Sequence, residues 1–227
     1  MKDIKYDLVV MGATGFTGKL VVEYLMKSYG VRNEHFTWAI AGRSSIKLEK
    51  LKHSLRELDS LSMDIPIILV DSLDSKSLDT MTSSCRLVIS TVGPYMRFGI
   101  PLVESCVKNA THYCDLTGEV PFIRQSIDLF HLKAKENSCR IIHSCGFDSI
   151  PSDIGTLLLQ ETSIKRNQKP CNEVNLYVKS IKGGLSGGTV ASMINISKHK
   201  PDNPKEQKIF GGPFALNPRE YLEYDTH

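Results

Sequence analysis

The stretch Tyr6–Gly18 (YDLVVMGATGFTG), followed by Lys19–Leu25 (KLVVEYL), decides the fold of this chain. An apolar run that contains β-branched residues ends sharply at Gly12, and Gly15 and Gly18 follow at three-residue spacing. Apolar residues then recur at helical spacing, which predicts a strand, a glycine turn and a helix in succession. A dinucleotide-binding fingerprint requires this order of elements.

Each glycine has its own role in such a turn. Gly12 allows the tight turn, Gly15 lets the backbone approach a pyrophosphate, and Gly18 permits close packing of the helix on the strand. Free N–H groups at the start of the helix favour the anion. The alternative is an ordinary strand-to-helix turn, because the spacing G-x-x-G-x-x-G differs from the G-x-G-x-x-G of many dehydrogenases. A full strand before the turn favours nucleotide binding, and we predict contacts from Gly12, Ala13, Thr14, Gly15, Phe16, Thr17 and Gly18.

Composition describes an ordinary globular protein. The 227 residues suit one domain and part of another, with 23% charged and 41% hydrophobic residues. A net charge of +3 is too small to indicate nucleic-acid binding. The N-terminus lacks a signal-peptide core, and no run approaches the ~20 apolar residues of a spanning helix, so we expect an intracellular protein. Six scattered cysteines without a C-x-x-C pair, and histidines without ligand spacing, predict free thiols and no metal site.

Strands and helices alternate six times between residues 6 and 161. Predicted strands lie at 8–11, 36–41, 65–70, 86–92, 113–116 and 140–145, and predicted helices include one that begins at Pro101 and one that begins at Pro151. This alternation predicts an α/β fold with a parallel, doubly wound sheet and helices on both faces. Ligands of such sheets bind outside the carboxyl ends of the strands. The loops at Gly12, Gly42, Asp71, Gly93, Asp115 and Gly146 therefore form one predicted functional rim.

Arg43 indicates which nucleotide is bound. Arg43 and Ser44 follow the second strand, where NAD enzymes place an acidic residue, and an arginine there accommodates the 2′-phosphate of NADP. We therefore expect NADP rather than NAD. The alternative is a solvent-facing Arg43 beside a helix-capping Ser44. Asp71 either borders the adenine or caps a helix, and Gly93 and Pro94 lie where the backbone passes the nicotinamide half.

Three residues are weak catalytic candidates. Tyr95 either donates a proton or fills a cleft wall, while Asp148 and Ser149 suit a helix start as well as a site. Asp115, Thr117 and Glu119 are equally suited to turns and to a site. Ser149 does not sit in G-x-S-x-G and no Ser–His–Asp order is evident, so we reject a hydrolase.

The pattern changes near Gln160. After a polar turn at 165–170, Val174, Leu176 and Val178 alternate with polar residues, which predicts a strand of an antiparallel sheet. A glycine-rich loop at 183–189 enters a predicted helix, and residues 201–227 offer no strand to complete the sheet. We predict an NADP-binding domain at 1–160 and an incomplete α+β domain at 161–227, used for substrate binding or dimerisation.

Six segments together resemble the saccharopine dehydrogenase-like oxidoreductases. They are residues 12–18, 41–43, 91–95 with 99–103, 114–119, 146–155 and 187–192. The resemblance implies a Rossmann domain, a nicotinamide cofactor, and kinship with saccharopine reductases and with trans-acting enoyl reductases of lipid and glycolipid assembly. It also implies association with a membrane, a lipid droplet or the mitochondrion. Family members are much longer, and the resemblance carries over no catalytic residue.

The leading hypothesis is an NADP-dependent reductase of an enoyl or imine group in a lipid-linked or amino-acid-like substrate. The alternative is a non-enzymatic nucleotide sensor or scaffold at lipid droplets or membranes. Expected partners are a small-molecule or lipid-linked substrate, a membrane or lipid-droplet surface, and a second copy of the chain, but not nucleic acid. We expect this 227-residue form to bind nucleotide with little or no turnover.

Overall fold

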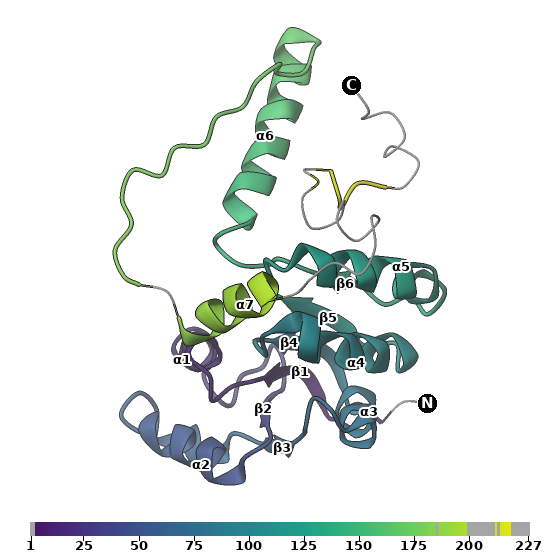
Figure 1. Cartoon of the computed structure of the whole chain (residues 1–227). Helices are drawn as coiled ribbons and strands as arrows, with labels where there is room; N and C mark the ends of the chain where they lie inside the picture. Colours follow the sequence, from purple (N-terminus) through teal and green to yellow (C-terminus); the bar gives the residue numbers. More distant parts are fainter. Residues whose placement is uncertain (1–2, 185, 199–211, 213, 219–227) are drawn as a thin grey trace.

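The computed structural model describes residues 3–184, 186–198, 212 and 214–218 (Figure 1). Six parallel strands form one sheet in the order β3-β2-β1-β4-β5-β6. The strands are β1 (Tyr6–Met11), β2 (Trp38–Gly42), β3 (Ile67–Leu69), β4 (Cys85–Ser90), β5 (His112–Asp115) and β6 (Ile141–Ile142). The strand order reverses between β1 and β4, which is where dinucleotides bind in sheets of this order. The predicted α/β fold is confirmed, although β6 is shorter than the strand predicted at 140–145.

Helices cover both faces of this sheet. They are α1 (Phe16–Tyr29), α2 (Ser45–Ser54), α3 (Ser75–Ser83), α4 (Tyr95–Lys108), α5 (Val120–Glu136), α6 (Ile150–Asn167) and α7 (Gly187–Lys198), with a 3₁₀ turn, η1, at Ser60–Asp64. Alternate residues of β1 point to opposite faces. Leu8 and Val10 pack with α1 and α2, whereas Val9 and Met11 pack with α3, α4 and α5. The core therefore has two layers that share the buried strands.

Helix α4 begins earlier than predicted. Pro101 lies inside this helix, which starts at Tyr95. The buried carboxylate of Glu119 accepts hydrogen bonds from the backbone N–H groups of Tyr95 (2.9 Å) and Met96 (2.8 Å). A carboxylate at this position satisfies donors that lack an intrahelical partner and complements the helix dipole. The start of α4 is thus fixed by a residue 24 positions away in sequence, which local pattern cannot reveal.

Helix α6 is longer than predicted and stands apart from the sheet. It continues through the first half of the polar turn predicted at 165–170 and ends at Asn167, where the C-cap residue Gln168 has a left-handed φ of 57°. None of its residues is buried, and Figure 1 shows it extending away from the sheet. No helix within the described ranges is long and apolar enough to span a bilayer.

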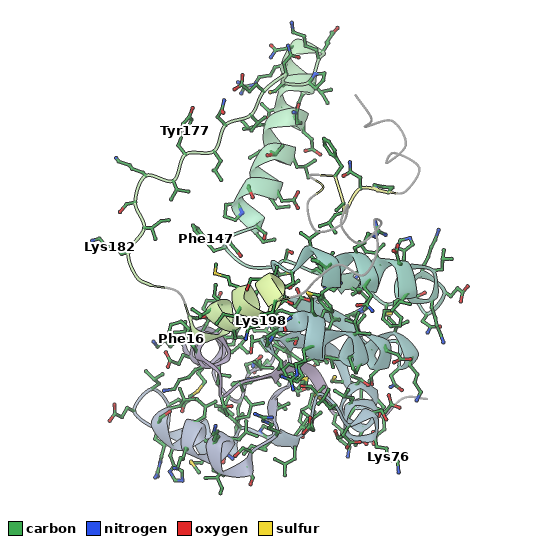
Figure 2. All side chains as sticks on the ribbon, in the orientation of Figure 1. Phe16, Lys76, Phe147, Tyr177, Lys182 and Lys198 are labelled. Carbon is green, nitrogen blue, oxygen red and sulfur yellow. The ribbon has the colours of Figure 1, made fainter. Side chains whose placement is uncertain are left out.

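The strand predicted at Val174, Leu176 and Val178 is not formed. Residues 171–182 pair with no strand in the part of the chain that the structure describes, and Leu176 is 62% exposed. Tyr177 and Lys182 project from this extended segment (Figure 2). The prediction failed because a strand needs a partner for its backbone groups. The chain then returns to the domain as α7, the predicted helix after the glycine-rich loop. Most of the predicted strandless region at 201–227 lies outside the described residues.

Candidate nucleotide-binding site

A cleft with a volume of about 370 Å³ lies at the carboxyl ends of the strands. Ligand pockets in proteins typically measure about 300–1,000 Å³. The glycine turn lines the cleft through five of the predicted residues, Gly12, Thr14, Gly15, Phe16 and Thr17. Arg43, Asp71 and Gly93, which follow β2, β3 and β4, line it as well. The topology thus brings most of the predicted nucleotide-binding residues together.

The glycine turn leaves no room for side chains on its inner side. Gly12 has a φ of 84°, and a Cβ there would lie 2.7 Å from Oγ1 of Thr91. This Oγ1 is 3.1 Å from the carbonyl oxygens of both Met11 and Gly12, so the hydroxyl ties β4 to the turn. A Cβ on Gly18 would collide with the carbonyl oxygen of Gly12 and approach Cα of Ala13 to 2.8 Å. Gly18 and Ala13 therefore shape the turn without lining the cleft.

The start of α1 offers free hydrogen-bond donors to the cleft. The backbone N–H groups of Phe16 and Thr17, which line the cleft, have no intrahelical partner, because they belong to the first turn. Gly15 is the N-cap residue and supplies no side chain to satisfy them. A Cβ at Gly15 would meet only the carbonyl oxygen of Gly12, at 3.3 Å, so the ligand side of the turn is open. Uncapped donors beside an open glycine fit a pyrophosphate.

Arg43 and Ser44 have different surroundings. Arg43 is exposed at the lip of the cleft and forms no ion pair with any described residue. The Ser44 hydroxyl accepts a hydrogen bond from the Lys47 N–H (3.4 Å) and caps α2. A free guanidinium at this position fits the 2′-phosphate of NADP. Asp71 lines the cleft, as its predicted place beside the adenine requires. Its carboxylate accepts a hydrogen bond from the Leu73 N–H (2.9 Å) in the turn before α3, but Asp74 caps that helix, so the alternative capping role of Asp71 is wrong.

The weak catalytic candidates lie outside the cleft lining. Tyr95 is buried, its hydroxyl donates to the carbonyl of Ser90 (3.1 Å), and its ring stacks on Phe122 with centroids 5.7 Å apart. Burial raises the pKa of Tyr95, and the nearby Asp115 raises it further. Pro94 is the N-cap residue of α4 and also lies outside the lining.

Asp148 and Ser149 lie in the turn before α6, where Phe147 is also exposed (Figure 2). Ser149 is the N-cap residue of α6 and makes no side-chain capping bond. Neither residue lines the cleft. The structure thus places none of the weak catalytic candidates in the cleft lining, and a catalytic role for these residues stays a prediction.

Sequence reasoning missed one wall of the cleft. Ser186 and Gly188, at the start of α7, line it together with the glycine turn. Figure 2 shows Phe16 at the start of α1, on the side of the domain where α7 lies. The glycine-rich loop at 183–189 was the available signal, but its return to the first domain depends on tertiary contacts. Phe98 of α4, also part of the lining, carried no sequence signal.

A Ser–His–Asp array exists although no sequence order suggested one. Nδ1 of His143 lies 2.7 Å from Oδ2 of Asp115, and Nε2 lies 2.9 Å from Oγ of Ser126. Ser126 is in the interior of α5, where the helix uses the backbone N–H groups. Because acyl transfer needs free donors for an oxyanion, this array lacks a required part of a hydrolase. We interpret it as a network that ties α5 to the ends of β5 and β6.

Comparison with known proteins finds a matching family model and longer curated relatives. Residues 8–142 match the family model described as the saccharopine dehydrogenase NADP binding domain. The trans-acting enoyl reductase of Mycobacterium tuberculosis is 38% identical over 213 residues, covering 93% of this chain and 49% of that protein. The enzyme of the same name from Mycobacterium ulcerans is 35% identical over 222 residues, covering 97% and 51%. The chain thus spans about half the length of these curated relatives.

A solved structure shares the fold. The apo saccharopine dehydrogenase (L-Glu forming) of Saccharomyces cerevisiae superposes with a TM-score of 0.52 at 18% identity, covering 72% of this chain and 32% of that one. At this identity the likeness shows the fold alone. The family match spans β1 to β6 and includes the glycine turn, Arg43 and Asp71. The chain therefore belongs to the family of saccharopine dehydrogenase NADP-binding domains, and its cofactor is NADP.

Proposed function

We propose that this chain is the NADP-binding part of an oxidoreductase that reduces an enoyl group in a lipid-linked substrate. The observation that carries the proposal is the cleft, which is lined both by the uncapped start of α1 and by the unpaired Arg43, the groups that suit a pyrophosphate and a 2′-phosphate. The names of the relatives at 35–38% identity favour an enoyl group. An imine in an amino-acid-like substrate is less favoured, because the family match covers only an NADP-binding domain and the yeast saccharopine dehydrogenase, at 18% identity, shares only the fold.

In this proposal the protein binds and orients the nucleotide, and NADPH supplies the hydride. The first turn of α1 holds the pyrophosphate, while Arg43 holds the 2′-phosphate and discriminates against NADH. Gly93 and Phe98 border the cleft beyond the end of β4, on the side where the strand order places the nicotinamide. The residues that position the substrate lie beyond those that line this cleft.

Substitution of Gly15 tests the site. Calorimetric titration with NADPH should show that Gly15→Val weakens binding by a factor of ten or more (~1.4 kcal/mol or above), because the branched side chain enters the space left for the pyrophosphate. Gly184→Val is the matched control, since nothing lies within 4 Å of its Cβ position and it does not line the cleft. Equal affinity of wild type and Gly15→Val would refute the site. Loss of near-ultraviolet NADPH absorbance with enoyl thioesters or imines then tests the reaction.

A second candidate function is binding without turnover, as a nucleotide sensor or scaffold. It is favoured by the absence of a paired sheet among described residues beyond β6, since hydride transfer needs a substrate held against the nicotinamide. Tight NADPH binding with no consumption of any enoyl or imine substrate would support it. Residues 161–227 are proposed as part of a substrate or dimerisation domain.

Exposed apolar side chains support two further proposals about partners. Leu157, Leu158 and Ile164 of α6 and Tyr177 and Ile181 of the extended segment are all exposed. Such surface is typical of an interface, so we propose either a second copy of the chain or a lipid surface, such as a membrane or lipid droplet, as its partner. Light scattering and flotation with phospholipid vesicles distinguish the two.

A further inference from the structure

Glu119 is a buried carboxylate that nucleotide binding does not use. It is 2% exposed, and its own N–H donates to Oγ1 of Thr117 (3.0 Å), which fixes the loop after β5. Oε2 accepts from the Met96 N–H, and Oε1 accepts from the Tyr95 N–H and also from the hydroxyl of Ser192 (2.7 Å). One side chain thus joins three segments that are distant in sequence.

Ser192 belongs to α7, which is outside the segment matched by the NADP-binding family model. Its Oγ lies 3.5 Å from the position that a Cβ of Gly93 would take, so α7 rests against the end of β4. About one turn earlier in the same helix, Gly188 forms part of the cleft wall, together with Ser186 just before the helix. The position of this wall therefore depends on how α7 is held at Ser192.

Few other contacts with the described residues hold α7 in place. None of its described residues is buried, and Val190, Met193 and Ile194 are exposed. The hydroxyl of Ser197 donates within the helix, to the carbonyl of Ile194 (3.0 Å). A hydrogen bond to a buried carboxylate is among the stronger polar contacts in proteins. The Glu119–Ser192 bond is therefore a major restraint on α7.

We propose that Glu119 is a positioning residue that holds α7, through Ser192, as the outer wall of the NADP cleft, and that this wall slows the release of the bound dinucleotide. The inference rests on the proposed NADP site. It predicts that breaking the Glu119–Ser192 bond frees α7 while the glycine turn and Arg43 keep their geometry.

Hydrogen exchange in the nucleotide-free protein tests the restraint itself. Ser192→Ala should increase amide exchange across residues 187–198 and leave β1 and α1 unchanged. Ser197→Ala is the matched control, because it removes a hydroxyl from the same helix without touching Glu119. Ser192→Thr should restore protection, since it keeps the hydroxyl. Equal exchange of α7 in wild type and Ser192→Ala would overturn the proposal whether or not nucleotide binds.

Stopped-flow dissociation tests the consequence for NADPH. Ser192→Ala should release NADPH about tenfold faster, the size expected for loss of a hydrogen bond to a charged group. Affinity for adenosine 2′,5′-bisphosphate, which probes only the glycine turn and Arg43, should be unchanged. An unchanged NADPH release rate would overturn the proposal. An equal loss of affinity for adenosine 2′,5′-bisphosphate would overturn it as well. If wild type fails to bind the fragment, the NADP site is wrong, and the exchange experiment alone decides on the restraint.

A double-mutant cycle assigns the effect to Glu119. If the two side chains act together, Glu119→Gln combined with Ser192→Ala should release NADPH no faster than the more affected single variant. Additive effects on the release rate would show that Glu119 and Ser192 act separately and would overturn the assignment.

Discussion

The domain from β1 to β6 and the segment from α6 to residue 182 both carry regularly spaced apolar residues, but these residues are buried only in the first region. In the first region the apolar faces of strands and helices meet one another, and Val9, Val10 and Leu102 are buried. In the second region α6 has no buried residue and Leu176 stays exposed. The difference teaches that a matching sequence pattern produces a packed element only where the chain supplies a partner surface.

Truncating one leucine in each region should give the largest difference in the free energy of unfolding. Leu102 of α4 is 1% exposed and lies in the core, so Leu102→Ala should lower the free energy of unfolding by about 2–5 kcal/mol. Leu158 of α6 is 63% exposed, so Leu158→Ala should change it by less than about 0.5 kcal/mol. Urea denaturation followed by tryptophan fluorescence measures both. A comparable loss for Leu158→Ala would show that α6 packs against a partner in solution.

Adding a methyl group to a glycine should have opposite effects in the two regions. Gly18→Ala drives a Cβ into the backbone of the glycine turn and should cost about 3 kcal/mol. Gly155 of α6 has nothing within 4 Å of its Cβ position, so Gly155→Ala should stabilise that helix by about 0.5–1 kcal/mol. Thermal unfolding monitored by circular dichroism distinguishes these outcomes. If Gly18→Ala is tolerated without loss, the described turn is incorrect.

Lowering the pH should reduce the stability of the domain from β1 to β6 but not that of α6. The carboxylate of Asp79 in α3 binds Lys108 and accepts a hydrogen bond from Ser105 of α4 (2.7 Å), and these contacts lower its pKa, Lys108 most strongly. A lowered folded-state pKa means that the stabilisation is present above the unfolded value of about 3.9 and is lost as the pH falls through the folded value. No ion pair of α6 is found among described residues.

The Asp79→Asn variant checks this pH dependence. At neutral pH it should lower the free energy of unfolding by about 1 kcal/mol, because the contacts are partly exposed. Below about pH 4 the difference from wild type should shrink, since wild type then loses the same contacts. Urea titrations at a series of pH values provide the measurement. A difference that stays constant down to pH 3 would exclude Asp79 as the titrating group.

The sequence correctly predicted those features of the fold and site that depend on residues close together in the chain. Gly12 and Gly15 marked the turn correctly because a tight turn and a close backbone approach are local requirements. The start of α4 was wrong because Glu119 fixes it from another loop. The Ser126–His143–Asp115 network was missed because three separate elements bring it together. Ser186 and Gly188 were assigned to a glycine-rich loop, but their place in the cleft depends on the docking of α7.

At 174–178 the sequence predicted a strand that does not form. Alternation of apolar and polar residues describes the faces of a strand but does not supply its hydrogen-bonding partner. The predicted boundary at residue 160 lies within α6 and stays a prediction.

Calorimetric titration of wild type and Arg43→Ala with NADPH and with NADH tests most directly that this cleft is the NADP site. The account predicts that Arg43→Ala weakens NADPH binding by about 1.5–3 kcal/mol, since it loses a charged partner of the 2′-phosphate, and leaves NADH binding nearly unchanged. Lys47→Ala is a suitable control, because Lys47 is an exposed cation of α2, four residues after Arg43, and does not line the cleft. A parallel loss for NADPH and NADH would contradict the account, because it would give Arg43 a structural role instead of contact with the 2′-phosphate.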